Sequence, residues 1–197
     1  EVKGTVASKE YKQEVFNDIW RPADTAQAAI GQLYNEFTPL QLANYIATLA
    51  NGGKRYKPYI IKRVLKYDGS IVNETKPEYE KVPVSAQTIE AVKEGMISVT
   101  HSIDGPAAAV FKDFPVIVAG KTGTAETGWE KNRSSNALFV CYAPAEKPEI
   151  AVAVVVERGV WGSYTAPIAR DVLEEYFGIG KKVGSDDSAT EEVPALS

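Results

Sequence analysis

A lysine, two threonines and a glycine stand together in the second half of the chain, directly after an apolar segment. They are Lys121, Thr122, Gly123 and Thr124. Lysine offers a cation with three donors and threonine a hydroxyl group, while glycine has no side chain that would keep a ligand from the backbone. These residue types suit an extended peptide that carries a carboxylate and lies beside a strand as an additional strand. For the short motif taken alone, a solvated lysine in a surface turn is the alternative.

The motif needs a strand to carry it, and the apolar residues before it predict one. Residues 116–118 are Val-Ile-Val, and β-branched side chains pack well in a buried strand. The strand continues into small and polar residues, which indicates a sheet edge that faces something other than the core. Residues 137–143 and 150–156 predict two further strands, and their short connection favours antiparallel pairing. The last strand is apolar almost throughout, so we expect helices on both of its faces.

Two helices with clear boundaries are predicted before these strands. The first has Thr38 as its N-cap and Pro39 in its first turn, and it ends at the Asn-Gly-Gly segment of residues 51–53. The second follows the N-cap Ser85 and contains Gly95. Because a glycine inside a helix costs about 1 kcal/mol relative to alanine, we expect close packing of a neighbour at Gly95.

A third helix is predicted over residues 164–177, with Gly178 as its end. Its apolar face is predicted to consist of Ile168, Val172 and Tyr176. Residues 59–72 predict a hairpin with an Asp-Gly pair as its two-residue turn. At the start of the chain, residues 1–20 predict a loop with one short helix, and residues 21–25 a turn.

Composition narrows the class of protein. The chain of 197 residues has a net charge of −4, which argues against nucleic acid as a partner. No apolar run approaches the roughly 20 residues that cross a bilayer. The single cysteine, Cys141, lies in a strand pattern and is interpreted as a small buried hydrophobe. The single histidine, His101, has no neighbours at metal-ligand spacing and is expected on the surface or in a loop. We predict neither a metal nor a cofactor.

Lys-Thr-Gly is one of three motifs of penicillin-binding proteins and class A β-lactamases. Further segments match that family at residues 24–32 (ending Ala-Ile-Gly-Gln), 38–43, 50–53, 119–126, 136–144 and 148–157. Most of residues 20–178 therefore resembles the C-terminal half of a penicillin-binding transpeptidase domain of the class B, monofunctional kind. Where the family often has a second glycine after Gly31, which we expect in a tight bend, this chain has Leu33.

The resemblance implies an α/β (α+β) fold of the β-lactamase/transpeptidase type, with a central antiparallel sheet flanked by helices. Only the C-terminal portion of that fold is expected here. Residues 1–178 are interpreted as this portion of the domain, and residues 179–197, which are polar and lack periodicity, as a disordered tail.

The resemblance also implies roles for the motif. Lys121 is expected to direct its ammonium toward the nucleophilic serine and the substrate carboxylate, and the hydroxyls of Thr122 and Thr124 to bind that carboxylate. The backbone N–H of Thr124 is the expected oxyanion donor, and Gly123 lets the substrate strand lie close. Trp129 is in a loop that borders the cleft in the family, so it could contact substrate; packing on the surface is the alternative.

The nucleophile is missing from the sequence. In the family a serine attacks the peptide carbonyl, and its base is the lysine of Ser-x-x-Lys, which a helix places on the same face. No serine of this chain has a lysine three residues later. Residues 134–136 read Ser-Ser-Asn and fit the second motif, Ser-x-Asn, by letters, but they follow Lys-Thr-Gly instead of preceding it. They are interpreted as a strand entrance, and both motifs are expected before Glu1.

The function implied by the resemblance is D,D-transpeptidation, in which peptidoglycan is cross-linked by an enzyme that β-lactams acylate. A β-lactamase, a carboxypeptidase or a β-lactam sensor on the same fold remains open, as does a non-catalytic binding or structural module. The expected partners are stem peptides ending in D-Ala-D-Ala, β-lactams, the upstream part of the same domain and other cell-wall synthesis proteins. The chain lacks an initiating methionine, so we expect it to be a piece of a longer protein. The resemblance implies that this longer protein is extracytoplasmic and is anchored in the cell membrane by an N-terminal segment.

Overall fold

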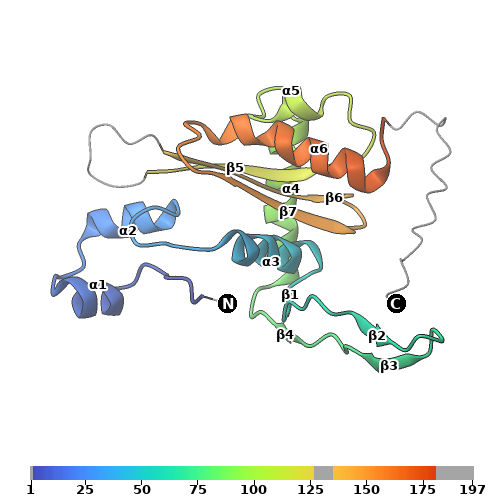
Figure 1. Ribbon diagram of the computed structural model, residues 1–197. Coiled ribbons are helices and arrows are strands. Elements are labelled where there is room, and N and C mark those ends of the chain that lie inside the picture. Colours follow the sequence, from blue (N-terminus) through green and yellow to red (C-terminus); the bar gives the residue numbers. More distant parts are fainter. Residues whose placement is uncertain (1, 127–134, 181–197) are drawn as a thin grey trace.

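A three-stranded antiparallel sheet forms the centre of the computed structural model, which describes residues 2–126 and 135–180 (Figure 1). Its strands are β5 (Ala119–Ala125), β6 (Asn136–Ala143) and β7 (Ile150–Val156). They pair in the order β5-β6-β7, so β6 is central. The predicted antiparallel pairing of consecutive strands is confirmed.

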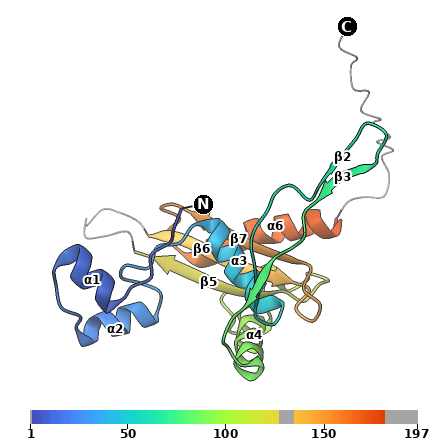
Figure 2. The ribbon, with the colours of Figure 1, turned by 90° about the horizontal axis from the view of Figure 1, so that it is seen from below.

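Helices cover both faces of this sheet, as Figures 1 and 2 show. On one face lie α6 (Ala166–Phe177) and the short α5 (Ala108–Phe111), and on the other lies α3 (Pro39–Ala50). The long helix α4 (Ala86–His101) runs across the sheet at the side of β5. Because α3 and α6 both contact β7, the prediction that helices cover both faces of this strand is confirmed.

The two faces of the sheet carry separate hydrophobic clusters. On the α6 face, Phe139 stacks on Phe111, and both pack with Leu173 of α6. On the α3 face, Tyr142 packs with Ile46 of α3 and with Met96 of α4. Full burial of each large apolar side chain contributes about 1.5–3 kcal/mol to folding, so the sheet is held from both sides.

The apolar face predicted for α6 is wrong. Its buried residues are Ala166, Ala169 and Leu173, whereas the predicted Ile168, Val172 and Tyr176 are 45%, 42% and 51% exposed. The alanines have no bulk beyond Cβ, so the helix can lie close to the sheet on that side. The predicted end of the helix is confirmed by Gly178, which has φ 67°.

The strand predicted at residues 116–118 begins later, at Ala119, and therefore contains the motif itself. The ladder pairs Ala119 with Tyr142, and the partner strand is soon followed by Pro144, which has no N–H to donate. Val118 is nevertheless fully buried, and its carbonyl accepts a hydrogen bond from Thr100 Oγ1 of α4 at 2.5 Å. The apolar residues thus fix the start of the strand without belonging to it.

The predicted starts of α3 and α4 are confirmed. Thr38 and Gln41 form a capping box at the start of α3, and Ser85 accepts from Thr88 N at the start of α4. The expected close packing at Gly95 is not found, because a Cβ built there meets no atom within 4 Å. This glycine therefore gives up helix stability without a packing partner in the described residues.

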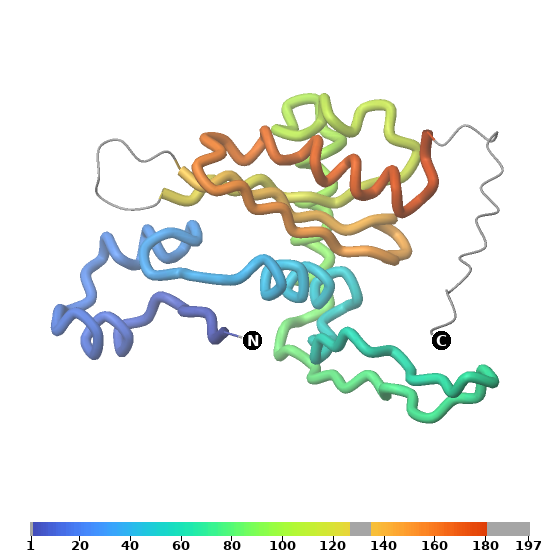
Figure 3. Tube along the Cα trace, viewed as in Figure 1, coloured from blue at the N-terminus to red at the C-terminus, as the bar shows by residue number. Residues whose placement is uncertain are grey.

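The N-terminal residues form two helices on the α3 side of the sheet (Figure 3). They are α1 (Lys9–Phe16), the short helix that was predicted, and α2 (Pro22–Ala29), which replaces the predicted turn at residues 21–25. Lys12 of α1 is only 4% exposed and contacts Asp24 of α2 at 2.7 Å and Asp18 at 3.2 Å. The carboxyl of Asp24 also accepts from Arg21 N at the start of α2, which explains how the turn-like sequence continues as a helix.

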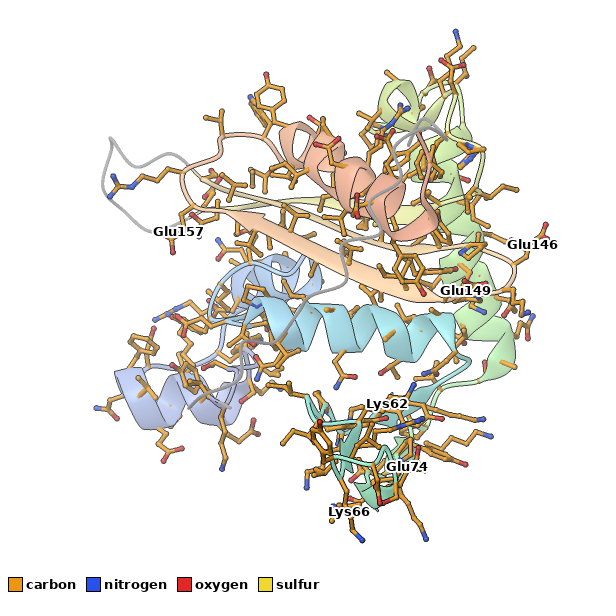
Figure 4. All side chains as sticks on the ribbon, turned by 45° about the vertical axis from the view of Figure 1, so that its right-hand side comes forward. Lys62, Lys66, Glu74, Glu146, Glu149 and Glu157 are labelled. Atoms are coloured by element: carbon orange, nitrogen blue, oxygen red, sulfur yellow. The ribbon has the colours of Figure 1, made fainter. Side chains whose placement is uncertain are left out.

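Between α3 and α4 the chain forms an arm that projects away from the sheet (Figures 1 and 2). Its base pairs β1 (Lys54–Tyr56) with β4 (Tyr79–Lys81), and its outer part pairs β2 (Arg63–Leu65) with β3 (Ile71–Glu74). Figure 4 shows Lys62, Lys66 and Glu74 on this arm. The predicted hairpin is confirmed, but its loop has three residues, since Lys66 N bonds to Ser70 O. Gly69 is the left-handed residue of that loop, with φ 80°.

Some sequence-based predictions fall outside the described residues. Trp129, Ser134 and residues 181–197 of the predicted tail lie there. In the part of the chain that the structure does describe, none of the helices is both long and apolar enough to cross a bilayer.

Candidate functional site

Lys121 to Thr124 lie in the middle of β5, at the edge of the sheet. One side of β5 pairs with β6, and within the described residues no strand pairs with its other side. Lys121 is exposed, and Thr122, Gly123 and Thr124 are half-buried. The predicted sheet edge is confirmed, and the lysine is not enclosed in the interior.

The side chains of the motif alternate across the sheet. Thr122 pairs with Phe139, whose ring packs on the α6 face, and Lys121 pairs with Val140, which packs on the α3 face. Because neighbouring residues of a strand point to opposite faces, the two threonine hydroxyls lie on the α6 face and the lysine on the other. The long lysine side chain returns to the strand edge, where its Nζ donates to Thr122 O at 2.7 Å.

The backbone of the two threonines faces the free edge. Thr122 O is bonded by Lys121 Nζ, and Thr124 O accepts from Gln32 Nε2 at 2.9 Å. Since the N–H and C=O of one residue in an antiparallel strand point to the same side, the N–H of Thr124 also faces this edge. A peptide laid along β5 would therefore meet a donor at Thr124 and an acceptor at Thr122.

The turn before α6 supports the motif from the α6 side. Gly162 begins the 3₁₀ turn η1 (Gly162–Thr165), and its N–H donates to Thr124 Oγ1 at 3.2 Å. A hydroxyl that accepts one bond keeps its own proton for another acceptor, such as a ligand carboxylate. A Cβ built on Gly162 would overlap Gly123 O and lie 2.7 Å from Gly123 N, so the two glycines allow the two backbones to touch.

Gly123 is also constrained on its other face. A Cβ built there would lie 3.3 Å from the Cβ of Leu138 on β6, closer than ordinary van der Waals contact. The prediction that Gly123 lets a ligand approach stays a prediction. Packing within the protein gives a second reason for a glycine at this position.

The sequence did not predict that Gln32 would bond to the backbone of the motif. It follows α2 and lies beside the end of β5, where its amide donates to Thr124 O and also accepts from Glu126 N at 3.4 Å. The residues on either side of it, Gly31 and Leu33, both have positive φ, 78° and 71°. The bend expected at Gly31 is confirmed, and Leu33 adopts a conformation in which a glycine would be unstrained. A leucine at the glycine position was the only signal in the sequence.

The remaining residues that the sequence singled out lie outside the motif. Cys141 is fully buried, and burial raises the pKa of its thiol to about 12, so the thiol stays protonated and is no nucleophile. His101 is exposed at the end of α4, as expected. Asn136 begins β6 and its Oδ1 accepts from Arg158 N at 3.1 Å, which confirms the strand entrance. Among the described residues, no group of His, Cys, Asp and Glu could hold a metal ion.

An antiparallel sheet between helical layers, with Lys-Thr-Gly-Thr on its edge strand, is the arrangement of a transpeptidase-type domain. Residues 4–174 match the family model described as "Penicillin binding protein transpeptidase domain". The chain therefore belongs to this family.

The chain is similar in sequence to two curated proteins. The chain is 31% identical over 195 residues to peptidoglycan D,D-transpeptidase MrdA of Haemophilus influenzae, with 90% of the chain and 29% of the relative covered. It is 38% identical over 172 residues to penicillin-binding protein 2A of Bacillus subtilis, with 78% and 24% covered. The chain thus spans less than a third of the length of either relative.

Solved structures agree with the fold. An imipenem acyl-enzyme complex of penicillin-binding protein A from M. tuberculosis superposes with a TM-score of 0.71 at 32% identity, covering 89% of this chain and 37% of that one. The complex between PBP2 and MreC from Helicobacter pylori gives 0.75 at 29% identity, covering 91% and 32%. The β-lactamase/transpeptidase-like fold predicted from the sequence is confirmed.

Proposed function

We propose that this chain is the C-terminal part of a class B peptidoglycan D,D-transpeptidase that cross-links stem peptides through a serine acyl-enzyme and is acylated by β-lactams. Residues 1–178 would form this part of the domain. The observation that carries the proposal is the open edge of β5, which presents the Thr124 N–H, two hydroxyls and the Lys121 ammonium together. The names of the two curated relatives support the reaction.

The substrate would bind as an added strand. Its terminal carboxylate would take the Lys121 ammonium and the hydroxyls of Thr122 and Thr124, which are charge-assisted contacts. In this pose the ammonium exchanges its bond to Thr122 O for the carboxylate. A peptide strand along β5 then places its scissile carbonyl near the Thr124 N–H.

The reaction would use a serine and its base from the residues expected before Glu1. The serine oxygen adds to the carbonyl carbon, the oxyanion forms at the Thr124 N–H, and the C–N bond to the terminal D-alanine breaks as that amine is protonated. An amine of a second stem peptide then attacks the acyl ester and releases the serine. Loss of one oxyanion donor typically reduces the rate by 10²–10³-fold, so the position of Thr124 is decisive.

The location and the partners belong to the same proposal. The domain would act outside the cytoplasm, held by a membrane anchor in a preceding segment. The H. pylori PBP2 structure contains MreC, which supports other cell-wall synthesis proteins as partners of the longer protein.

Labelling with a fluorescent penicillin tests the proposal. The chain alone should give no covalent band, because it has no Ser-x-x-Lys, while the longer protein should give one. In the longer protein, Lys121→Ala should slow acylation roughly 10–100-fold, since a hydrogen bond to a charged group contributes about 1.5–3 kcal/mol.

Lys66→Ala is the matched control, because this lysine lies on the arm, away from β5 (Figure 4). It should leave acylation unchanged. A labelled band at the mass of the chain itself would reveal a nucleophile within it, and equal acylation of both lysine variants would refute the site. A longer protein that hydrolyses penicillin rapidly would favour a β-lactamase.

A further inference from the structure

A glutamine from outside the motif takes the place of a neighbouring strand at the end of β5. The side-chain amide of Gln32 donates to Thr124 O at 2.9 Å and accepts from Glu126 N at 3.4 Å. These two backbone groups belong to alternate residues and face the free edge. One residue of a parallel partner strand would bond to the same carbonyl and the same N–H through its own N–H and C=O. The amide therefore takes the place of the backbone N–H and C=O of one such residue.

The backbone of Gln32 is itself fixed on both sides. Its N–H donates to Gln27 O at 3.0 Å, and its carbonyl accepts from Asn35 Nδ2 at 2.9 Å. The left-handed conformation of the neighbouring Leu33 costs roughly 1–2 kcal/mol. Such strain persists only where the surrounding structure holds it, and it gathers at functional sites. The strained bend is what brings the amide to the strand.

We propose that Gln32 is a positioning residue for the oxyanion donor and also sets the end of the peptide-binding edge. Its amide holds the peptide that follows Thr124, so the preceding Thr124 N–H stays aimed at the substrate carbonyl. A peptide laid along β5 pairs as far as Thr124 and no further, because Gln32 occupies the next position. The inference rests on the transpeptidase function proposed above.

The two steps of acylation should respond differently to Gln32. Initial binding depends on the contacts of the carboxylate with the Lys121 ammonium and with the hydroxyls of Thr122 and Thr124. Gln32 bonds to the backbone carbonyl of Thr124 and to none of these three groups. The chemical step depends on the Thr124 N–H, and a misplacement of about 1 Å at a reacting centre can slow a reaction about 10²-fold. Loss of Gln32 should therefore lower the acylation rate constant and leave the dissociation constant of the initial complex almost unchanged.

The experiment uses the longer protein and a fluorescent penicillin mixed by stopped flow. Gln32→Met keeps the side-chain length and removes both hydrogen bonds, while Gln32→Glu keeps the acceptor for Glu126 N and loses the donor to Thr124 O. We expect both to lower the acylation rate constant about 10–100-fold, with the initial dissociation constant changed less than about 3-fold. Gln87→Met, on the exposed surface of α4, is the matched control and should change neither constant.

The outcomes separate this inference from the proposed function. A longer protein that takes no penicillin label removes the proposed function and the inference together. If the wild type is acylated and Gln32→Met is acylated at the same rate, the inference alone is overturned. It is also overturned if only the initial dissociation constant rises, or if the lost rate equals the lost fraction of folded protein measured by circular dichroism.

Discussion

Replacing Gly162 by alanine tests whether the motif strand is held by the turn before α6. The new Cβ would overlap Gly123 O and lie 2.7 Å and 2.8 Å from Gly123 N and C. All three are backbone atoms, so no flexible side chain can move aside. Either η1 or the motif strand must shift by more than half an ångström to restore ordinary contact.

The loss of folding stability expected for Gly162→Ala has two contributions. Inserting a methyl group into a packed region costs about 1–3 kcal/mol. A shift of η1 also weakens the bond from Gly162 N to Thr124 Oγ1, which contributes about 0.5–1.5 kcal/mol. Together they predict a loss of roughly 2–4 kcal/mol, which lowers the melting temperature of a domain of this size by at least about 4 °C.

Thermal unfolding of the longer protein, followed by circular dichroism, measures this loss, and penicillin acylation at 20 °C measures the displacement of Thr124. The matched control is Gly95→Ala, where a Cβ meets nothing within 4 Å. It should stabilise α4 by up to about 1 kcal/mol and leave acylation as it is. Equal melting temperatures for Gly162→Ala and the wild type would refute the proposed contact between the two glycines.

Two further predictions concern the N-terminal residues. Leu33→Gly should stabilise the protein by up to about 1 kcal/mol, because the relief of left-handed strain exceeds the added freedom of glycine in the unfolded chain; a lower melting temperature would contradict this. The hydrogen bond from Lys12 holds the pKa of Asp24 below its usual value, and the one from Arg21 does the same for the pKa of Asp18. Their stabilisation is present above the unfolded pKa of about 3.9 and is lost as the pH falls through the folded values. Melting temperatures between pH 2 and pH 6 should therefore fall less steeply with acid in Asp24→Asn than in the wild type.

Local signals in the sequence predicted where the helices begin, but not which of their faces packs against the sheet. The capping residues Thr38 and Ser85 act within one turn of a helix, so their positions could be read directly. The face of α6 could not, because a 3.6-residue period is compatible with either the alanine side or the Ile168 side. The choice depends on how closely the helix approaches the sheet, which the helix sequence does not contain.

The two residues that bond to the motif from distant parts of the chain could not be predicted, for a related reason. Gln32 meets β5 across 92 positions of sequence, and Gly162 meets it across 38. A polar side chain that bonds to a distant backbone leaves no periodic signal in the sequence. A glycine that is required by close contact between two backbones cannot be distinguished in the sequence from any other turn glycine. The Lys-Thr-Gly-Thr motif could be found because its chemistry lies in consecutive residues.

An open edge strand raises a physical question, since a strand without a second neighbour is free to fray while an oxyanion donor must be held in place before the reaction. Among the described residues no strand pairs with the outer side of β5, and two contacts hold the strand there without covering its edge. The Gly162 N–H holds the Thr124 hydroxyl from the α6 face, and the Gln32 amide holds the Thr124 carbonyl at the end of the strand. Between them the Thr124 N–H is left for a ligand. A second strand would hold β5 more firmly, but it would occupy the donor that the proposed reaction needs.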